Sequence, residues 1–303
     1  MTDLSETTDA LLASGPVPRE QFDGDMPVSA QRRKRPILLW LSIGWLVLLV
    51  VLAIAAPILP IENPNVYAGH GIRTPPFESL AQPLGTDNLG RSELSRLIFG
   101  SRVSLFASVL AAAIALAAGL AVGIIAGYFR GIVDTVLSTI IDAVLSFPGL
   151  VLLLALTAVL QPSVRTLIIG LTVLSWAYFA RLARANTLKV ATSEYVVASR
   201  GLGARPIRVL WREILPNVTA SVITLAGLVI AGLILAEASL SFIGLGVRPP
   251  TPSWGNMIAD GEPQLSNAPF LVFVPSIVLF LTIFAVNYFG DWLRTRSDAA
   301  SRI

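Results

Sequence analysis

The chain has 303 residues, of which 54% are hydrophobic and only 14% are charged, and its mean hydropathy is +0.73. Soluble domains average about 45–50% apolar and about 25% charged residues, so a single water-soluble core cannot bury this much apolar surface. The composition therefore predicts an all-α polytopic membrane protein. The absence of cysteine excludes disulfides, thiolate metal sites and cysteine nucleophiles. The net charge of +3 is small, and the basic run at residues 32–35 fits a topology anchor on anionic lipid better than a nucleic-acid patch, so no nucleic-acid partner is expected.

The N-terminal part predicts a polar arm followed by a membrane anchor. Residues 1–35 are rich in Ser, Thr, Asp and Pro, and we expect a disordered cytoplasmic arm. Residues 36–60 contain the apolar run 37–59, which is the first expected transmembrane anchor. Ala53-Ile54-Ala55 is similar to a signal-peptide cleavage site, but the apolar run exceeds the usual ~7–15 residues and follows a long polar segment. We therefore expect the anchor to remain uncleaved.

Residues 61–101 are expected to form an exterior loop. Its first half contains four prolines and predicts irregular structure. Its second half predicts a capped short helix from about Leu89, with Leu94, Leu97 and Ile98 on one side and the arginines Arg91 and Arg96 elsewhere. By itself this pattern is also compatible with an amphipathic segment that leads into the second span.

Residues 102–294 are expected to form a five-span core, followed by a cytoplasmic tail at residues 295–303. The expected spans are residues 103–129, about 134–160, 166–180 with a helical continuation to 185, about 218–243, and 270–289. Pro148 is predicted to kink the third of the six spans. The repeated small-residue motif Gly119, Gly123 and Gly127 predicts close helix packing.

The distribution of Lys and Arg predicts that both termini are cytoplasmic. With this orientation 16 of the 22 basic residues lie in cytoplasmic segments, and six remain outside, namely Arg73, Arg91, Arg96, Arg102, Arg165 and Arg248.

The cytoplasmic loop at about 185–217 predicts two short helices between spans four and five. Glu194 suits the first turn of one helix, Gly203 is expected to break it, Pro206 to begin the second, and Pro216 to end the unit. Helical spacing places four residues of the first helix on one face, namely Tyr195, Ala198, Ser199 and Leu202. Such an exposed face fits either a partner's groove or lipid headgroups.

Glu237 lies inside the fifth expected span, where a carboxylate is costly unless it faces protein or water. It is a candidate for the translocation path or its gate, together with Phe242. The alternative, which we favour, is a structural hydrogen bond. The only histidine, His70, lacks neighbouring ligands, and neither a Walker A loop nor a hydrolase triad is present. We therefore predict no catalytic residue, metal site or cofactor in this chain.

Three motifs, taken together, resemble one family. The segment from Val197-Ala198-Ser199 through Gly203 to Ile214-Leu215-Pro216 resembles the EAA loop of bacterial binding-protein-dependent ABC importer permeases, although Val197 replaces the family's glutamate. Two exterior segments resemble the C-type permease subunit of dipeptide and oligopeptide importers. The first, residues 83–105, includes Thr86, Asp87, Gly90 and Arg91, and the second, residues 236–258, includes Trp254 and Gly255.

This resemblance implies a multi-pass protein of the bacterial inner membrane that imports di- or oligopeptides. It implies an ATPase-coupling site at Tyr195, Val197, Ala198, Ser199, Leu202, Gly203 and Pro216. It also implies several partners: a second permease, two ATP-binding cassette subunits or one fused ATPase, and an extracytoplasmic binding protein. ATP and Mg would then be bound by the ATPases. Nickel, glutathione or another small solute remains an alternative cargo.

Two other classes compete with this interpretation. An ion-coupled secondary transporter would predict internal repeats and several paired intramembrane charges. A membrane scaffold or receptor would not require the arginine-rich inner loop.

Overall fold

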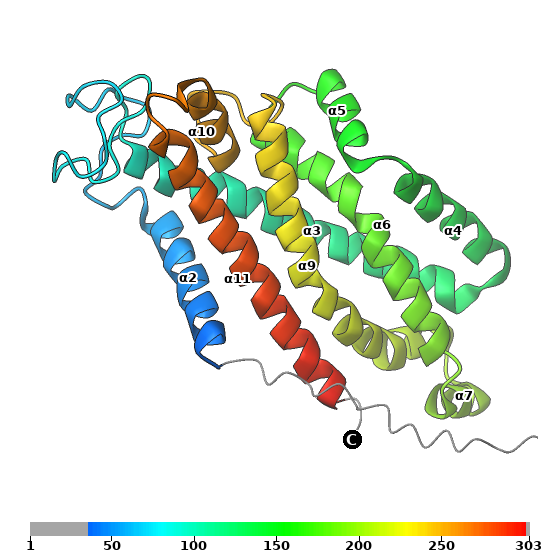
Figure 1. The fold of residues 1–303 in the computed structure, drawn as a ribbon. Helices are drawn as coiled ribbons and strands as arrows, with labels where there is room; N and C mark the ends of the chain where they lie inside the picture. Colours follow the sequence, from blue (N-terminus) through cyan, green and yellow to red (C-terminus); the bar gives the residue numbers. More distant parts are fainter. Residues whose placement is uncertain (1–35, 301–303) are drawn as a thin grey trace, which may run out of the picture. The chain divides into compact units, whose positions relative to one another are not determined.

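The computed structural model describes residues 36–300, so the expected disordered arm at residues 1–35 and the last residues of the expected tail lie outside it. Within this range the chain forms helices and loops without a β-strand (Figure 1). The helices are α2 (Pro36–Ala55), α3 (Glu93–Phe129), α4 (Gly131–Ser146), α5 (Gly149–Val159), α6 (Val164–Val190), α7 (Glu194–Gly201), α8 (Pro206–Val209), the π-helical turn η1 (Leu210–Ile214), α9 (Leu215–Phe242), α10 (Trp254–Gly261), the 3₁₀ turn η2 (Glu262–Gln264) and α11 (Phe270–Ala300).

Five helices of the described part are long and apolar enough to cross a membrane, and there are six candidate spans if α4 and α5 are counted as one. The axes of α4 and α5 differ by 89°, with the break at Phe147 and Pro148. The expected third span at about 134–160 is thus broken at the predicted position of the kink, and the bend is much sharper than a kink within one helix. A proline restrains the residue before it to extended backbone, and Phe147 has φ −77° and ψ 134°, which ends α4 instead of bending it.

The α3 helix packs closely on α6 through the predicted small-residue motif. A Cβ added at Gly123 would lie 2.4 Å from the carbonyl oxygen of Ala180, and one at Gly119 would lie 2.5 Å from the Cβ of Phe179. These residues tolerate no side chain because the two backbones are nearly in contact. A cluster of buried apolar residues lies along this contact and also includes Val196 of α7 and Ile214 of η1. The cluster therefore connects α7 and η1 to α3 and α6.

Two further contacts hold the outer helices. A Cβ at Gly227 of α9 would lie 2.6 Å from the Cα of Gly290 in α11, and the indole of Trp45 in α2 donates to the hydroxyl of Thr282 in α11 at 3.2 Å. The indole bond ties α2 to the bundle although most of its side chains are exposed or only partly buried.

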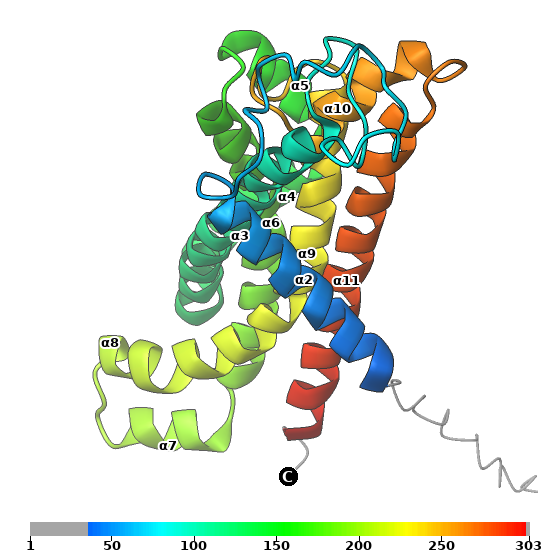
Figure 2. The same ribbon diagram turned by 90° about the vertical axis from the view of Figure 1, so that its left-hand side faces the viewer.

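The two ends of the described bundle carry different elements. The loop at residues 61–92, α5 and α10 lie at one end, and α7 and α8 lie at the other (Figures 1 and 2). The start of α2 and the end of α11 lie at the same end as α7. This arrangement places the segments predicted to be exterior together, opposite the predicted cytoplasmic loop.

The helix expected to start at about Leu89 begins later and does not stop. Ser92 is the N-cap of α3, its hydroxyl accepts from the backbone N–H of Ser95, and α3 continues for 37 residues to Phe129. Gly90 has φ +70°, a conformation that favours glycine, so the preceding turn cannot be part of the helix. The predicted short helix is thus the first part of the second span.

Candidate functional site

The loop after α6 contains α7 and α8 in the predicted places. Glu194 lies in the first turn of α7, Gly203 has φ +81° between the two helices, and Pro206 begins α8. Pro216, however, does not end the unit, because α8, η1 and α9 form one continuous helix over Pro206–Phe242. The π-helical turn immediately before Pro216 changes the local hydrogen-bond pattern, which allows a residue without an N–H to follow in the helix.

Two side chains fix α7 to the rest of the chain. Val196 is fully buried in the cluster shared with α3, α6 and α9. The hydroxyl of Ser199 donates a 2.6 Å hydrogen bond to Oε1 of Glu213 in η1. Ser199 is therefore half-buried and does not belong to the fully exposed face predicted for it. Sequence reasoning missed the role of Glu213, although this residue directly precedes the motif residues Ile214-Leu215-Pro216.

The opposite side of α7 is exposed and largely apolar. Tyr195, Val197 and Ala198 are exposed, and Leu202 is 90% exposed at the end of the helix. A cavity of about 600 Å³ adjoins this face and is lined by Ser199, Leu202, Gly203, Ala204, Arg208, Arg212 and Glu213. A short rigid helix with an apolar outer face beside a cationic hollow is suited to bind a protein partner.

Glu237 occupies a buried junction at the other end of α9. The hydroxyl of Ser241 donates to its Oε1 at 2.8 Å, and Ser104 of α3 and Ser253 lie beside the same carboxyl group. Glu237 is fully buried, whereas Phe242 is 45% exposed. The structure thus places the two candidate path residues in different surroundings and joins Glu237 to α3 and to the segment before α10.

Trp254 and Gly255, from the motif at residues 236–258, lie at the start of α10 and pack against this junction. The backbone N–H of Trp254 donates to Ser104 Oγ at 3.3 Å, and its indole donates to the carbonyl of Leu97 at 3.1 Å. A Cβ on Gly255 would lie 2.2 Å from the carbonyl oxygen of Ala238. Trp254 and Gly255 therefore connect α10 with α3 and α9.

The motif at residues 83–105 takes part in an ion cluster in which Asp87, Arg91 and Arg96 are buried and Asp260 is partly exposed. Asp87 accepts from the guanidinium of Arg91 at 2.6 Å and lies 3.3 Å from Nε of Arg96, while Asp260 of α10 lies 3.3 Å from Nη2 of Arg96. The sequence placed Arg91 and Arg96 away from the apolar side of the helix, and in the structure both are buried. Burial raises the pKa of Asp260 above its ordinary value, against the opposing effect of the two arginines.

Thr86 and Gly90 shape the loop around that cluster. The hydroxyl of Thr86 accepts from the N–H of Thr74 at 2.9 Å and donates to the carbonyl of Gly71 at 3.0 Å. A Cβ on Gly90 would lie 2.4 Å from the ring of Tyr67. Sequence reasoning chose these residues by resemblance, and the structure shows that they hold the two halves of the loop at residues 61–92 together.

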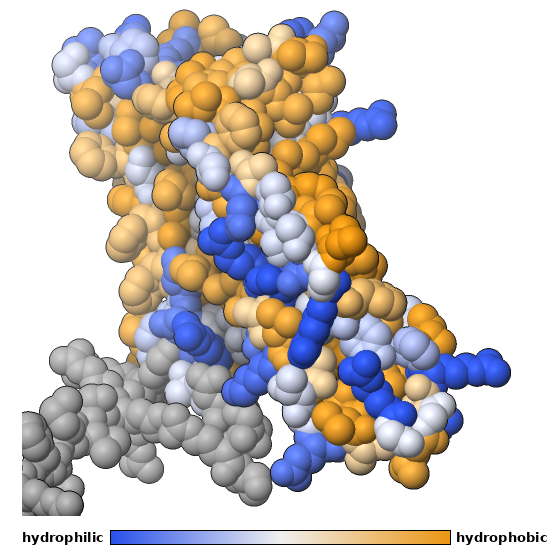
Figure 3. All heavy atoms as spheres, turned by 90° about the vertical axis from the view of Figure 1, so that its right-hand side faces the viewer, coloured by the Kyte–Doolittle hydropathy of each residue, from blue (hydrophilic) through white to orange (hydrophobic). Residues whose placement is uncertain are grey.

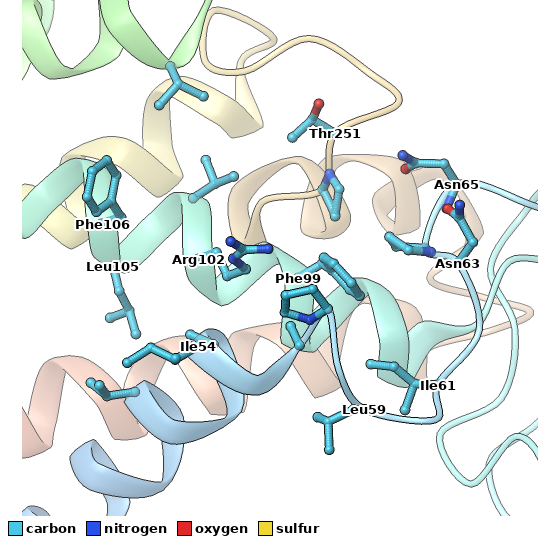
Figure 4. A pocket seen from close by; sticks show the side chains of 18 of the residues that line it. Ile54, Leu59, Ile61, Asn63, Asn65, Phe99, Arg102, Leu105, Phe106 and Thr251 are labelled. Atoms are coloured by element: carbon cyan, nitrogen blue, oxygen red, sulfur yellow. The ribbon is translucent and has the colours of Figure 1, made fainter.

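A separate cavity of about 1060 Å³ lies between α2, α3 and the segment before α10 (Figure 4). Ile54, Leu105 and Phe106 give it apolar walls, and Arg102 projects from α3. Neither Glu237 nor α7 lines it, so it is distinct from both predicted sites. Among residues 36–300 no group of three His, Cys, Asp or Glu side chains could hold a metal ion.

The comparisons with known proteins agree on one group. Residues 119–302 match the family described as "binding-protein-dependent transport system inner membrane component". The chain is 40% identical over 274 residues to the probable peptide ABC transporter permease protein y4tQ of Sinorhizobium fredii, covering 89% of this chain and 91% of that protein. It is 36% identical over 255 residues to the glutathione transport system permease protein GsiD of Escherichia coli, covering 84% of each.

The fold is similar to solved structures of transporters as well. A chain of the MetNI methionine ABC transporter in an inward-facing conformation matches with a TM-score of 0.56 and 20% identity, covering 67% of this chain and 97% of that one. A chain of an amino acid ABC transporter solved with histidines matches with a TM-score of 0.52 and 18% identity, covering 67% and 94%.

Proposed function

Because the chain belongs to the family of binding-protein-dependent transport system inner membrane components, we propose that its cargo is a di- or oligopeptide. The chain is a permease subunit of an ABC importer and a multi-pass protein of the inner membrane. This family membership sets aside the ion-coupled transporter and the scaffold considered from the sequence. In the proposed assembly a second permease completes the translocation path, and a binding protein delivers the peptide from outside.

The rigid mounting of α7 supports its role as the ATPase-coupling helix. Because Val196 and the bond from Ser199 to Glu213 attach α7 to the membrane helices, a force on its outer face would be transmitted to α3, α6 and α9. That outer face presents Tyr195, Val197 and Leu202 to the partner. Two ATP-binding cassette subunits, or one fused ATPase, bind ATP and Mg in this proposal, while this chain is non-catalytic and holds no cofactor.

The proposed topology has six spans, with α4 and α5 together forming the third, and both termini in the cytoplasm. The positions of α7, the start of α2 and the end of α11 at one end of the bundle support it (Figure 2). The exterior end would then carry the ion cluster and α10, which are held together by side-chain contacts and would form the surface that meets the binding protein.

Peptide cargo is supported by the name of the Sinorhizobium relative, and glutathione by the name of the Escherichia relatives. Glutathione is itself a tripeptide, so one site chemistry can serve both proposals. Uptake into membrane vesicles of dialanine, a tripeptide, glutathione and Ni²⁺, each with the purified binding protein, would separate them. Uptake of Ni²⁺ alone would contradict the peptide proposal.

The coupling role is tested by substitution of an exposed apolar residue. Leu202→Asp should leave membrane insertion intact but reduce co-purification of the ATPase at least tenfold, because a charge then enters an apolar contact. Phe77→Asp is the matched control, since Phe77 is 84% exposed in the loop at the opposite end. Equal capture of the ATPase by both variants would contradict the assignment of α7.

A further inference from the structure

Two ion pairs join α4 to α6, and they differ in their surroundings. Arg184 of α6 donates to Asp134 near the start of α4, with Nη2 to Oδ2 at 2.8 Å, and both side chains are largely covered. Arg181 of α6 donates to Asp142 at 2.5 Å, and both side chains are 61% exposed. The first pair fastens the two helices together, whereas the second faces outward from them.

Asp142 belongs to a continuous polar face of α4. Thr135, Thr139, Asp142 and Ser146 follow one another at intervals of four, three and four residues, which places them in one line along the helix. All four are exposed. The hydroxyl of Thr139 donates to the carbonyl of Thr135, and that of Ser146 to the carbonyl of Asp142, so the hydroxyl hydrogens are used within the helix. The charges of Asp142 and Arg181 remain at the surface.

The rest of the exposed surface of α4 is apolar. Val136 and Ile140 are exposed and lie to one side of the polar line, and the exposed Ile132 lies at the start of that line, three residues before Thr135. A band of hydrophilic side chains follows this side of the bundle between hydrophobic regions (Figure 3). Because α4 and α6 both belong to candidate spans, lipid can cover the apolar side but not an exposed carboxylate and guanidinium. The polar face must therefore meet water or another polar group.

We propose that this face of α4 lines the water-filled translocation path, and that Asp142 and Arg181 receive the ammonium and carboxylate ends of a zwitterionic peptide. The inference rests on the proposed function of the chain as a peptide permease. One carboxylate cannot use all five N–H donors of a guanidinium, so Arg181 can bind a second carboxylate while it still contacts Asp142. The pair offers both charges that a peptide with free termini requires, and a neutral solute would not need them.

Accessibility to water is tested with single cysteines in this cysteine-free chain. In reconstituted vesicles containing the whole transporter, Thr139→Cys should react with a small charged methanethiosulfonate reagent at least tenfold faster than the neighbouring Ile140→Cys. Saturating dialanine should slow the reaction of Thr139→Cys. Equal rates at the two positions, or an unreactive Thr139→Cys in a transporting protein, would overturn the proposal and indicate that a protein surface covers the face.

Recognition of charge is tested by uptake. Asp142→Asn should lower uptake of dialanine relative to N-acetyl-dialanine by about tenfold, the usual effect of losing one charged hydrogen bond. Arg181→Gln should do the same for dialanine relative to its C-terminal amide. Asp134→Asn is the control, because that carboxylate is held against Arg184, and it should affect all these peptides in parallel. Parallel losses in Asp142→Asn would overturn substrate contact, whereas failure of the wild type to carry any peptide would instead refute the proposed function.

Discussion

At the scale of single residues, the surroundings of Glu237 limit what it can do. Its carboxyl group is buried where α9, α3 and the segment before α10 meet, and Ser241 donates to it from one turn further along α9. Ser104 of α3 and Ser253 lie beside the same carboxyl group, and this enclosure by protein favours the structural interpretation of Glu237 over contact with substrate. A buried polar group of this kind contributes chiefly by keeping the surrounding hydroxyls satisfied.

We expect Glu237→Gln to cause a modest loss of uptake that is the same for dialanine and N-acetyl-dialanine. Glutamine keeps an acceptor oxygen for Ser241, and interhelical hydrogen bonds in one membrane protein average only about 0.6 kcal/mol. Uptake by both peptides in vesicles is the measurement. A loss that is selective for the free amino group by tenfold, or about 1.4 kcal/mol, would instead make Glu237 a substrate residue.

Gly203 is required for its backbone conformation and not for space. Its φ of +81° is unfavourable for residues with a Cβ, yet a Cβ there would meet no atom within 4 Å. We expect Gly203→Val to leave the protein in the membrane but to misplace α8 relative to α7, at a cost of about 1–2 kcal/mol, and to reduce peptide uptake per ATP hydrolysed.

The neighbouring Gly201 provides the control for that experiment. A Cβ on Gly201 also meets nothing within 4 Å, but its backbone is helical. Gly201→Val should therefore keep the ratio of uptake to ATP hydrolysis close to that of the wild type. Normal coupling in Gly203→Val at normal expression would refute the role given to this turn.

At the scale of helices, the sequence predicted the elements better than their connections. Long apolar runs identified the spans because burial in lipid requires about 20 apolar residues. Charge patterns did not reveal that Arg91 and Arg96 are buried against Asp87 and Asp260, since Asp260 is more than 160 positions away in the chain. Nor could local rules predict that the helix continues through Pro216, because that depends on the preceding π-helical turn.

The contact between α3 and α6 provides a test of helix packing. Gly123→Leu should destabilise the protein by about 1–3 kcal/mol, because its Cβ would press on backbone atoms of Ala180 and Arg184 that cannot move alone. Thermal unfolding of the purified protein in detergent is the measurement. Ala121→Leu, on the exposed side of the same helix, should have little effect. Equal unfolding temperatures for the two variants would contradict close packing at this contact.

At the scale of the whole molecule, the broken pair α4 and α5 decides the topology. If the pair crosses the membrane, every element after it keeps the orientation predicted from the basic residues, and α7 lies in the cytoplasm. If the pair instead enters and leaves on one side, the orientation of α6 is reversed and α7 lies outside. The placement of α5 and α7 at opposite ends of the bundle favours a crossing (Figure 1).

Single cysteines distinguish these topologies in intact cells. Glu78→Cys in the exterior loop and Gln161→Cys after α5 should both react with an impermeant maleimide, because both positions are exposed at the outer end. Thr192→Cys, exposed between α6 and α7, should react only after the cells are permeabilised. Labelling of Thr192→Cys in intact cells, with Gln161→Cys protected, would show that α4 and α5 turn back within the membrane. The coupling role of α7 would then fail as well, because an ATPase in the cytoplasm could not reach it.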